Sequence, residues 1–139
     1  MDATAVWKGG MSFTGTGLTS NFTLPMDASS RSGGEDKGFR PLELILVGLA
    51  GCTAMDVISI LEKKRQDVTA FEVKVHGDQR EEYPRGLNRF TIEYVITGKG
   101  VERDAVERAV QLSQEKYCSV SATLRSAGPI ETRITISEA

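Results

Sequence analysis

The sequence predicts an α+β fold, because alternating segments of strand type stand before, between and after two helical segments. Residues 41–61 form the longest apolar stretch and are typical of a buried helix. Residues 69–76 and 89–97 alternate apolar and polar side chains, as half-buried strands do. Residues 102–116 repeat apolar side chains at helical spacing. We therefore expect an antiparallel sheet around a long buried central helix, with a second, amphipathic helix.

The first 40 residues predict a small sheet followed by a loop. Residues 3–8 alternate weakly, and Gly9-Gly10 after them is a hairpin turn signal. Met11–Thr14 and Asn21–Met26 are the next candidate strands. Residues 27–40 are rich in glycine, serine and charge, and a loop of this length suggests a functional or mobile role.

The central helix has clear start and stop signals. Pro41 suits the first helical position, where its missing N–H costs nothing. Glu43 meets the positive end of the helix dipole, and Lys63, Lys64 and Arg65 follow at the negative end.

Apolar side chains cover most of the circumference of this helix, so it needs cover on all sides. The run without charge is shorter than the about 20 residues that span a bilayer, which favours a core helix over a membrane helix. A sheet covers only one side, and the rest of the chain is barely long enough to supply a second layer. We therefore predict a homodimer in which the central helices, or the surfaces over them, meet. The alternative is a monomer with the second helix as the missing layer.

The second half of the chain predicts a sheet and one more helix. Residues 69–76 and 89–97 are expected to pair antiparallel, and residues 130–137 form a last alternating strand. The helix over 102–116 has one buried face. The residues expected on this buried face are Val106, Ala109, Val110, Ser113 and Tyr117.

Length and composition predict one domain over residues 1–139. The net charge of −2, with acids and bases mixed, gives no basic patch for nucleic acid. The N-terminus lacks an apolar signal core, so the expected compartment is the cytoplasm, where thiols stay reduced. With two cysteines and His76 as the only histidine, no zinc site is expected. No cofactor is expected.

Cys52 is the first candidate for chemistry, although a cysteine in an apolar helix is more often an inert hydrophobe. Cys118 lies at the end of the second helix, in a more polar setting. Two cysteines could act as a reactive thiolate and its resolving partner. The first would become a sulfenic acid and condense with the second to a disulfide.

Cys52 would need a cation for activation, because apolar burial raises the pKa of a thiol and the helix dipole fades within its first turn. Arg31 and Arg40 of the loop are the candidates, from the same subunit or a partner, unless they are exposed loop charges. Asp56 shares a helical face with Cys52 and could orient an arginine, or simply face solvent. Glu43 is about half a turn away, so a role at the helix N-terminus is favoured.

Residues 40–57 and 115–121 resemble the OsmC/Ohr family, and the order of elements fits over nearly the whole chain. The resemblance implies an OsmC-like fold, an intertwined homodimer with sites at the interface, and thiol-dependent reduction of organic hydroperoxides. It makes Cys52 the peroxidatic and Cys118 the resolving cysteine, with a dithiol such as dihydrolipoamide as reductant.

This chain departs from the family pattern at two places. Leu42 stands where the family has its catalytic glutamate, and the acid is instead Glu43. The first hairpin contains Lys8 but no arginine. A competing reading is therefore a non-enzymatic dimer that senses redox state or binds a small apolar ligand. A third is a structural module with inert thiols.

Overall fold

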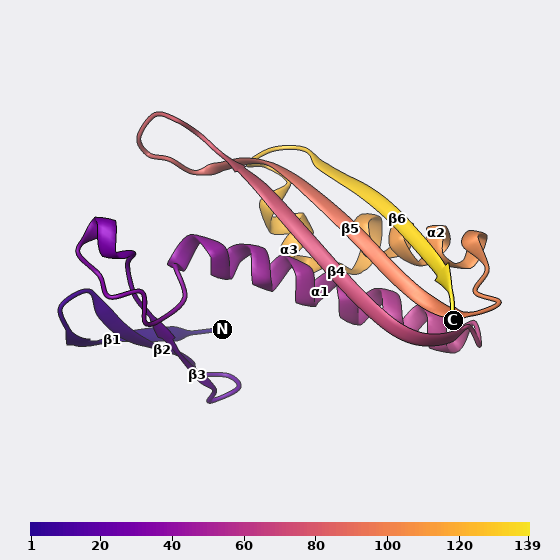
Figure 1. Ribbon diagram of the computed structural model, residues 1–139, viewed down its shortest axis with the longest axis horizontal. Coiled ribbons are helices and arrows are strands. Elements are labelled where there is room, and N and C mark those ends of the chain that lie inside the picture. The colour runs from indigo at the N-terminus through magenta and orange to yellow at the C-terminus, as the bar shows by residue number, and fades with distance from the viewer. The chain divides into compact units, whose positions relative to one another are not determined.

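The computed structural model describes all 139 residues and confirms the α+β class (Figure 1). The strands are β1 (Ala3–Gly9), β2 (Ser12–Gly17), β3 (Thr23–Met26), β4 (Asp67–Gln79), β5 (Leu87–Lys99) and β6 (Ile130–Glu138). The helices are η1 (Ser30–Ser32, 3₁₀), α1 (Pro41–Lys63), α2 (Arg103–Leu112), η2 (Ser113–Tyr117, a π-helical turn) and α3 (Ser119–Leu124).

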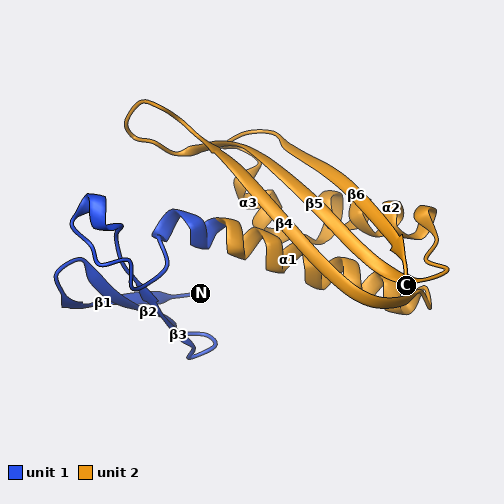
Figure 2. Cartoon of the chain, viewed as in Figure 1, with its two compact units in different colours: residues 1–45 blue, residues 46–139 orange.

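The chain divides into two compact units, residues 1–45 and 46–139, with the division inside α1 (Figure 2). The single domain expected over the chain stays a prediction.

The first unit contains an antiparallel sheet in the order β1-β2-β3. The predicted hairpin turn is present: Gly9 and Gly10 have φ angles of 106° and 53°, which glycine adopts without steric cost. The indole Nε1 of Trp7 donates a hydrogen bond to the Gly10 carbonyl at 2.9 Å, which closes the turn. The second strand runs to Gly17, beyond the predicted end at Thr14.

The loop of residues 27–40 is organised around one buried carboxylate. Asp27 accepts hydrogen bonds from the backbone N–H groups of Ala28, Glu35 and Lys37 at 2.8, 3.1 and 3.2 Å. Burial acts to raise the pKa of the Asp27 carboxyl, but these donors lower it below its ordinary value. The loop therefore has a defined internal structure, which its composition did not reveal.

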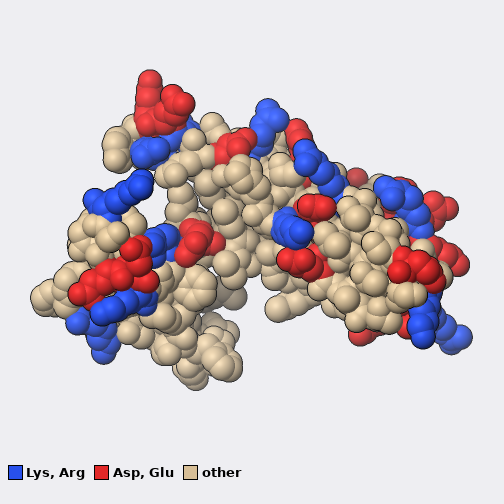
Figure 3. Space-filling model, viewed as in Figure 1, with Lys and Arg blue, Asp and Glu red and all other residues tan.

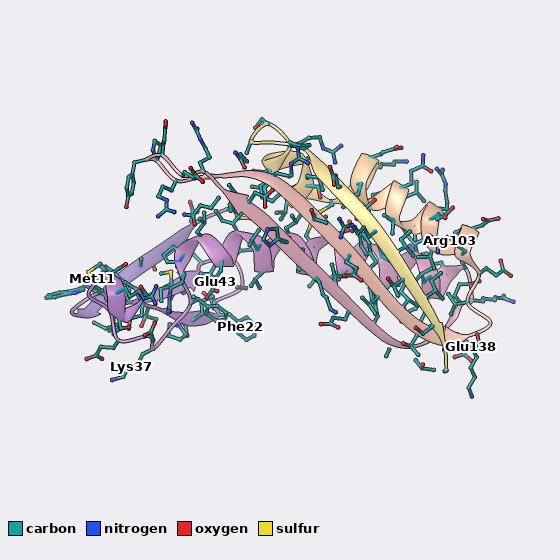
Figure 4. All side chains as sticks on the ribbon, turned by 45° about the horizontal axis from the view of Figure 1, so that its top comes forward. Met11, Phe22, Lys37, Glu43, Arg103 and Glu138 are labelled. Carbon is teal, nitrogen blue, oxygen red and sulfur yellow. The ribbon has the colours of Figure 1, made fainter.

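Helix α1 begins as predicted. The backbone N–H of Arg40 donates to Oε1 of Glu43 at 2.9 Å, so the carboxylate satisfies one of the donors left free at the helix start. Figure 4 labels Glu43 near this end of α1.

The predicted burial of α1 on all sides is wrong for the single chain. Its buried residues repeat every four positions and form one stripe: Leu49, Thr53, Val57 and Leu61. On other faces, Val47 and Met55 are 53% and 72% exposed. By length and composition alone α1 could also cross a membrane, since an 18-residue window has a mean hydropathy of 2.2. A core helix meets the same criterion, and the buried stripe favours that role.

The second unit is a three-stranded sheet with helices on one face (Figure 1). Strands β4 and β5 pair antiparallel, as predicted, but β6 pairs parallel to β5. The fully antiparallel sheet was a wrong expectation, because the chain returns to the sheet through a helical crossover, which reverses its direction. The inner side of the central strand β5 contributes Phe90, Ile92, Tyr94 and Ile96 to the core.

The predicted helix over 102–116 is present, but from Ser113 on it changes from α-helical to π-helical geometry. Helix α2 stops at Leu112, and the π-helical turn η2 follows. This turn changes the angular phase of the helix, so Tyr117 is 51% exposed instead of buried as predicted. The short helix α3 was not predicted, since its serines and threonine have weak helix propensity.

Acidic and basic side chains are intermixed over the face of the molecule shown in Figure 3. This agrees with the small net charge of −2.

Candidate functional site

The two cysteines are neighbours in the second unit. Cys52 lies in the middle of α1, is half-buried and packs against the core cluster that contains Cys118. Cys118 lies between η2 and α3 and is only 4% exposed. Both are free thiols. The fold thus brings together the two cysteines that we predicted from the sequence as a redox pair.

Cys118 has an environment that favours the thiol over the thiolate. Burial raises the pKa of the Cys118 thiol, and the adjacent Cys52 thiol raises it further. Ser121 opposes this shift through its side chain and through its backbone N–H, which lies 3.4 Å from the sulfur. Because burial wins, Cys118 keeps its proton at neutral pH.

A network of polar side chains lies between α1, β5 and η2. The hydroxyl oxygen of Thr53 lies 2.7 Å from the hydroxyl of Tyr94 and 2.8 Å from that of Ser113. Ser113 donates to Oδ2 of Asp56 at 2.9 Å. Gln114 donates from Nε2 to Thr53 at 3.2 Å and to Tyr94 at 3.1 Å.

The carboxylate of Asp56 sets the direction of this network. An ionised carboxylate only accepts, so the Ser113 proton points to Asp56. Thr53 must then donate to Ser113, and Tyr94 to Thr53. Burial raises the pKa of Tyr94 more than its hydrogen bonds lower it, so the phenol stays neutral and can donate. The result is a chain of donors that ends on one carboxylate.

Sequence reasoning did not identify this network. Its signal was a polar residue within each predicted buried face: Thr53 in the central helix and Ser113 in the second helix. Both side chains are fully buried. A buried hydroxyl needs a partner, so a polar position in each of two apolar faces is an indication that the two meet.

The structure gives Asp56 a serine partner instead of the arginine that we expected. None of the ion pairs within the chain involves Asp56. Its carboxylate borders a cavity of about 550 Å³ between α1, α2 and η2. The other lining residues are Met55, Ser59, Ile60, Lys63, Lys64, Leu112 and Tyr117.

The remaining candidates belong to the first unit, where the structure shows their contacts. Arg40 pairs with Asp36 and donates from Nη1 to the Gly38 carbonyl at 2.9 Å. Arg31 is exposed in η1. Glu43 accepts a hydrogen bond at the start of α1, in agreement with the predicted role at the helix N-terminus.

The pKa of Cys118 can be tested in a Cys52→Ser variant, where it is the only thiol. Its alkylation rate by iodoacetamide, measured against pH and scaled to its own plateau, should have a midpoint above the about 8.5 of an unperturbed thiol. Loss of the Cys52 neighbour removes only a secondary cause of the shift, because burial remains. A midpoint at or below that of a cysteine peptide would contradict this description of the site.

Comparison with known proteins identifies the family. Residues 34–133 match the family model described as OsmC-like protein. Protein YhfA of Escherichia coli (strain K12) is 42% identical over 127 residues, which cover 91% of each chain.

Solved structures share the fold. A hypothetical protein from Aquifex aeolicus VF5 superposes with a TM-score of 0.85 at 30% identity, over 99% of this chain and 96% of that one. An organic hydroperoxide resistance protein OsmC from Legionella pneumophila superposes with a TM-score of 0.72 at 16% identity, over 96% and 95% of the two chains. The predicted OsmC-like fold is thus confirmed. The chain belongs to the OsmC-like protein family.

Proposed function

We propose that this protein is a thiol-dependent peroxidase that reduces organic hydroperoxides through Cys52 and Cys118. The observation that carries the proposal is the pairing of a half-buried thiol with a buried one beside it. Membership of the OsmC-like family supports it, and so does the fold shared with an organic hydroperoxide resistance protein.

Cys52 acts first, because it is the more accessible of the two thiols and Cys118 keeps its proton. The Cys52 thiolate attacks the terminal oxygen of the hydroperoxide and the O–O bond breaks. The alkoxide takes up a proton and leaves as an alcohol, while Cys52 becomes a sulfenic acid. The peroxide gains the two electrons that the sulfur loses.

Cys118 then resolves the sulfenic acid. Its sulfur bonds to the sulfur of Cys52, and the hydroxyl leaves as water with the proton of Cys118. A dithiol such as dihydrolipoamide reduces the disulfide and returns both thiols. The cytoplasm suits this cycle, because its reducing pool opposes unproductive oxidation.

As the cation that activates Cys52 we propose Arg31 or Arg40, the two arginines that precede α1. Arg31 has no ion-pair partner within the chain, so its charge is available. Arg40 would have to exchange its pairing with Asp36. Asp56 supports the site from one turn beyond Cys52, and Glu43 supports it by fixing the start of α1.

A homodimer supplies the second cover for α1. Val47 and Met55 are exposed apolar side chains on this helix. At Gly48 and Gly51 an added Cβ would meet no atom within 4 Å, so another backbone can approach closely there. A two-fold pairing of such a surface with its own copy is the commonest arrangement.

The second candidate function is a non-enzymatic dimer that senses redox state or binds a small apolar ligand. The cavity beside Asp56 favours it, since Met55, Ile60 and Leu112 offer apolar contacts there. The leucine at position 42 favours it too, because the acid of the family pattern is absent from that place.

Peroxidase activity is tested by stopped-flow consumption of cumene hydroperoxide with dihydrolipoamide as reductant. The wild type should turn over, and Cys52→Ser should fall to background because the attacking sulfur is gone. Cys118→Ser should consume one equivalent rapidly and then slow, because its sulfenic acid has no internal partner. Equal consumption of cumene hydroperoxide by the wild type and Cys52→Ser would overturn the proposed peroxidase activity and favour the non-enzymatic function.

The dimer is tested by sedimentation equilibrium at micromolar concentration. We expect the wild type at twice the 15.1 kDa of the chain. A Val47→Glu variant should shift toward the monomer, because a carboxylate cannot be buried without a partner. Glu81→Gln, a change of charge in an exposed turn, serves as control. A wild type that sediments as a monomer would contradict the dimer.

A further inference from the structure

Ser113 connects the helix that carries Cys52 to the backbone of Cys118. Its hydroxyl bonds to two residues of α1, Thr53 at 2.8 Å and Asp56 at 2.9 Å. Its carbonyl accepts the backbone N–H of Cys118 at 2.7 Å. Ser113 thus forms hydrogen bonds to α1 through its side chain and to Cys118 through its main chain.

The π-helical form of η2 makes this link possible. In a regular α-helix the carbonyl of Ser113 would accept the N–H of Tyr117, four residues on. In the wider π-helical turn this carbonyl instead accepts the N–H of Cys118, five residues on. π-Helical turns occur frequently at functional sites, and here the turn ends on a thiol of the redox pair.

Burying the hydroxyl groups of this network costs free energy, which indicates that they do more than fill space. Thr53, Tyr94 and Ser113 are fully buried, and burying hydroxyls is unfavourable unless each finds a partner. Apolar side chains of similar shape could fill the same volume at little or no loss of stability. Polar groups, unlike apolar ones, fix a single register between α1 and η2.

We propose that Ser113, held by Thr53 and Asp56, is a positioning residue that sets Cys118 against Cys52 and thereby favours their disulfide. The proposal rests on the dithiol–disulfide couple of the proposed function. A disulfide needs its two Cα atoms at a narrow range of separations and its side chains correctly aimed. Preorganising the pair raises the effective concentration of one thiol at the other.

Two substitutions weaken the link to different extents, because Ser113→Ala removes both of its bonds to α1 and Thr53→Val removes one of them. Ser113→Ala removes the hydroxyl that bonds to α1 but keeps the carbonyl that holds Cys118. Thr53→Val keeps the shape of residue 53 and removes its hydroxyl, whereas Thr53→Ser keeps the hydroxyl. Ser119→Ala removes an exposed hydroxyl next to Cys118 that makes no bond to α1, and it is the matched control.

The measurement is the equilibrium between dithiol and disulfide in the full chain. Each variant is equilibrated in glutathione redox buffers at pH 7, and its free thiols are counted by alkylation and mass spectrometry. Ser113→Ala and Thr53→Val should lower the equilibrium constant for disulfide formation about tenfold, a rise in reduction potential of about 30 mV. Thr53→Ser and Ser119→Ala should stay within about twofold of the wild type, a change of under 10 mV.

The outcomes separate the two proposals. A wild type that forms no Cys52–Cys118 disulfide overturns the couple of the proposed function, and this inference with it. A wild type that forms the disulfide, with Ser113→Ala and Thr53→Val unchanged, overturns the positioning role alone. Circular dichroism checks that each variant folds. If Ser113→Ala does not fold, the Thr53→Val and Thr53→Ser pair decides the question.

Discussion

The second unit depends on one contact, that between the buried stripe of α1 and the inner side of β5. The stripe repeats every four residues, so it presents one row of side chains to the sheet. Its single polar member, Thr53, meets the single polar member of the inner side of β5, Tyr94, at 2.7 Å. Among apolar side chains many registers would bury a similar area, whereas this pair of hydroxyls is satisfied in only one.

The same contact decides the environment of Cys52. Because Cys52 precedes Thr53, it lies beside the buried stripe and not within it, which leaves its thiol half-buried. Cys118 lies between η2 and α3 and is buried in the core. Two chemically identical side chains therefore have different surroundings, one open enough to meet a substrate and one kept protonated by burial. In the proposed cycle this difference gives the two thiols an order of action.

Much of the fold could be predicted because its signals are local. The Gly9-Gly10 turn, the start of α1 at Pro41 and the alternation in β4 and β5 each depend on a few neighbouring residues. The π-helical turn and the parallel direction of β6 were missed, because they depend on contacts between distant parts of the chain. The bonds of Ser113 to α1, for example, join residues 60 and 57 positions apart. Helix α3 was missed because its serines and threonine have weak helix propensity.

The candidate site divides in the same way. Cys52 and Cys118 stood out as the only two thiols, and the family resemblance gave them roles. Ser113 was placed on the buried face of its helix and Thr53 was not singled out, because a single Ser or Thr in an apolar face does not show which residue it bonds to. Asp56 and Cys52 share a face of α1, as a helical wheel predicts. A helical wheel cannot show that Ser113 of another element donates a hydrogen bond to the carboxylate of Asp56.

We propose that Cys52 and Cys118 of one chain form a redox couple. Non-reducing peptide mapping of the fully reduced protein, after one equivalent of cumene hydroperoxide, tests it most directly. We predict a chain lighter by two hydrogen atoms, with the Cys52 and Cys118 peptides joined. Cys52 oxidised to sulfinic acid with Cys118 still free, or a disulfide between the Cys52 residues of two chains, would contradict a redox couple within one chain.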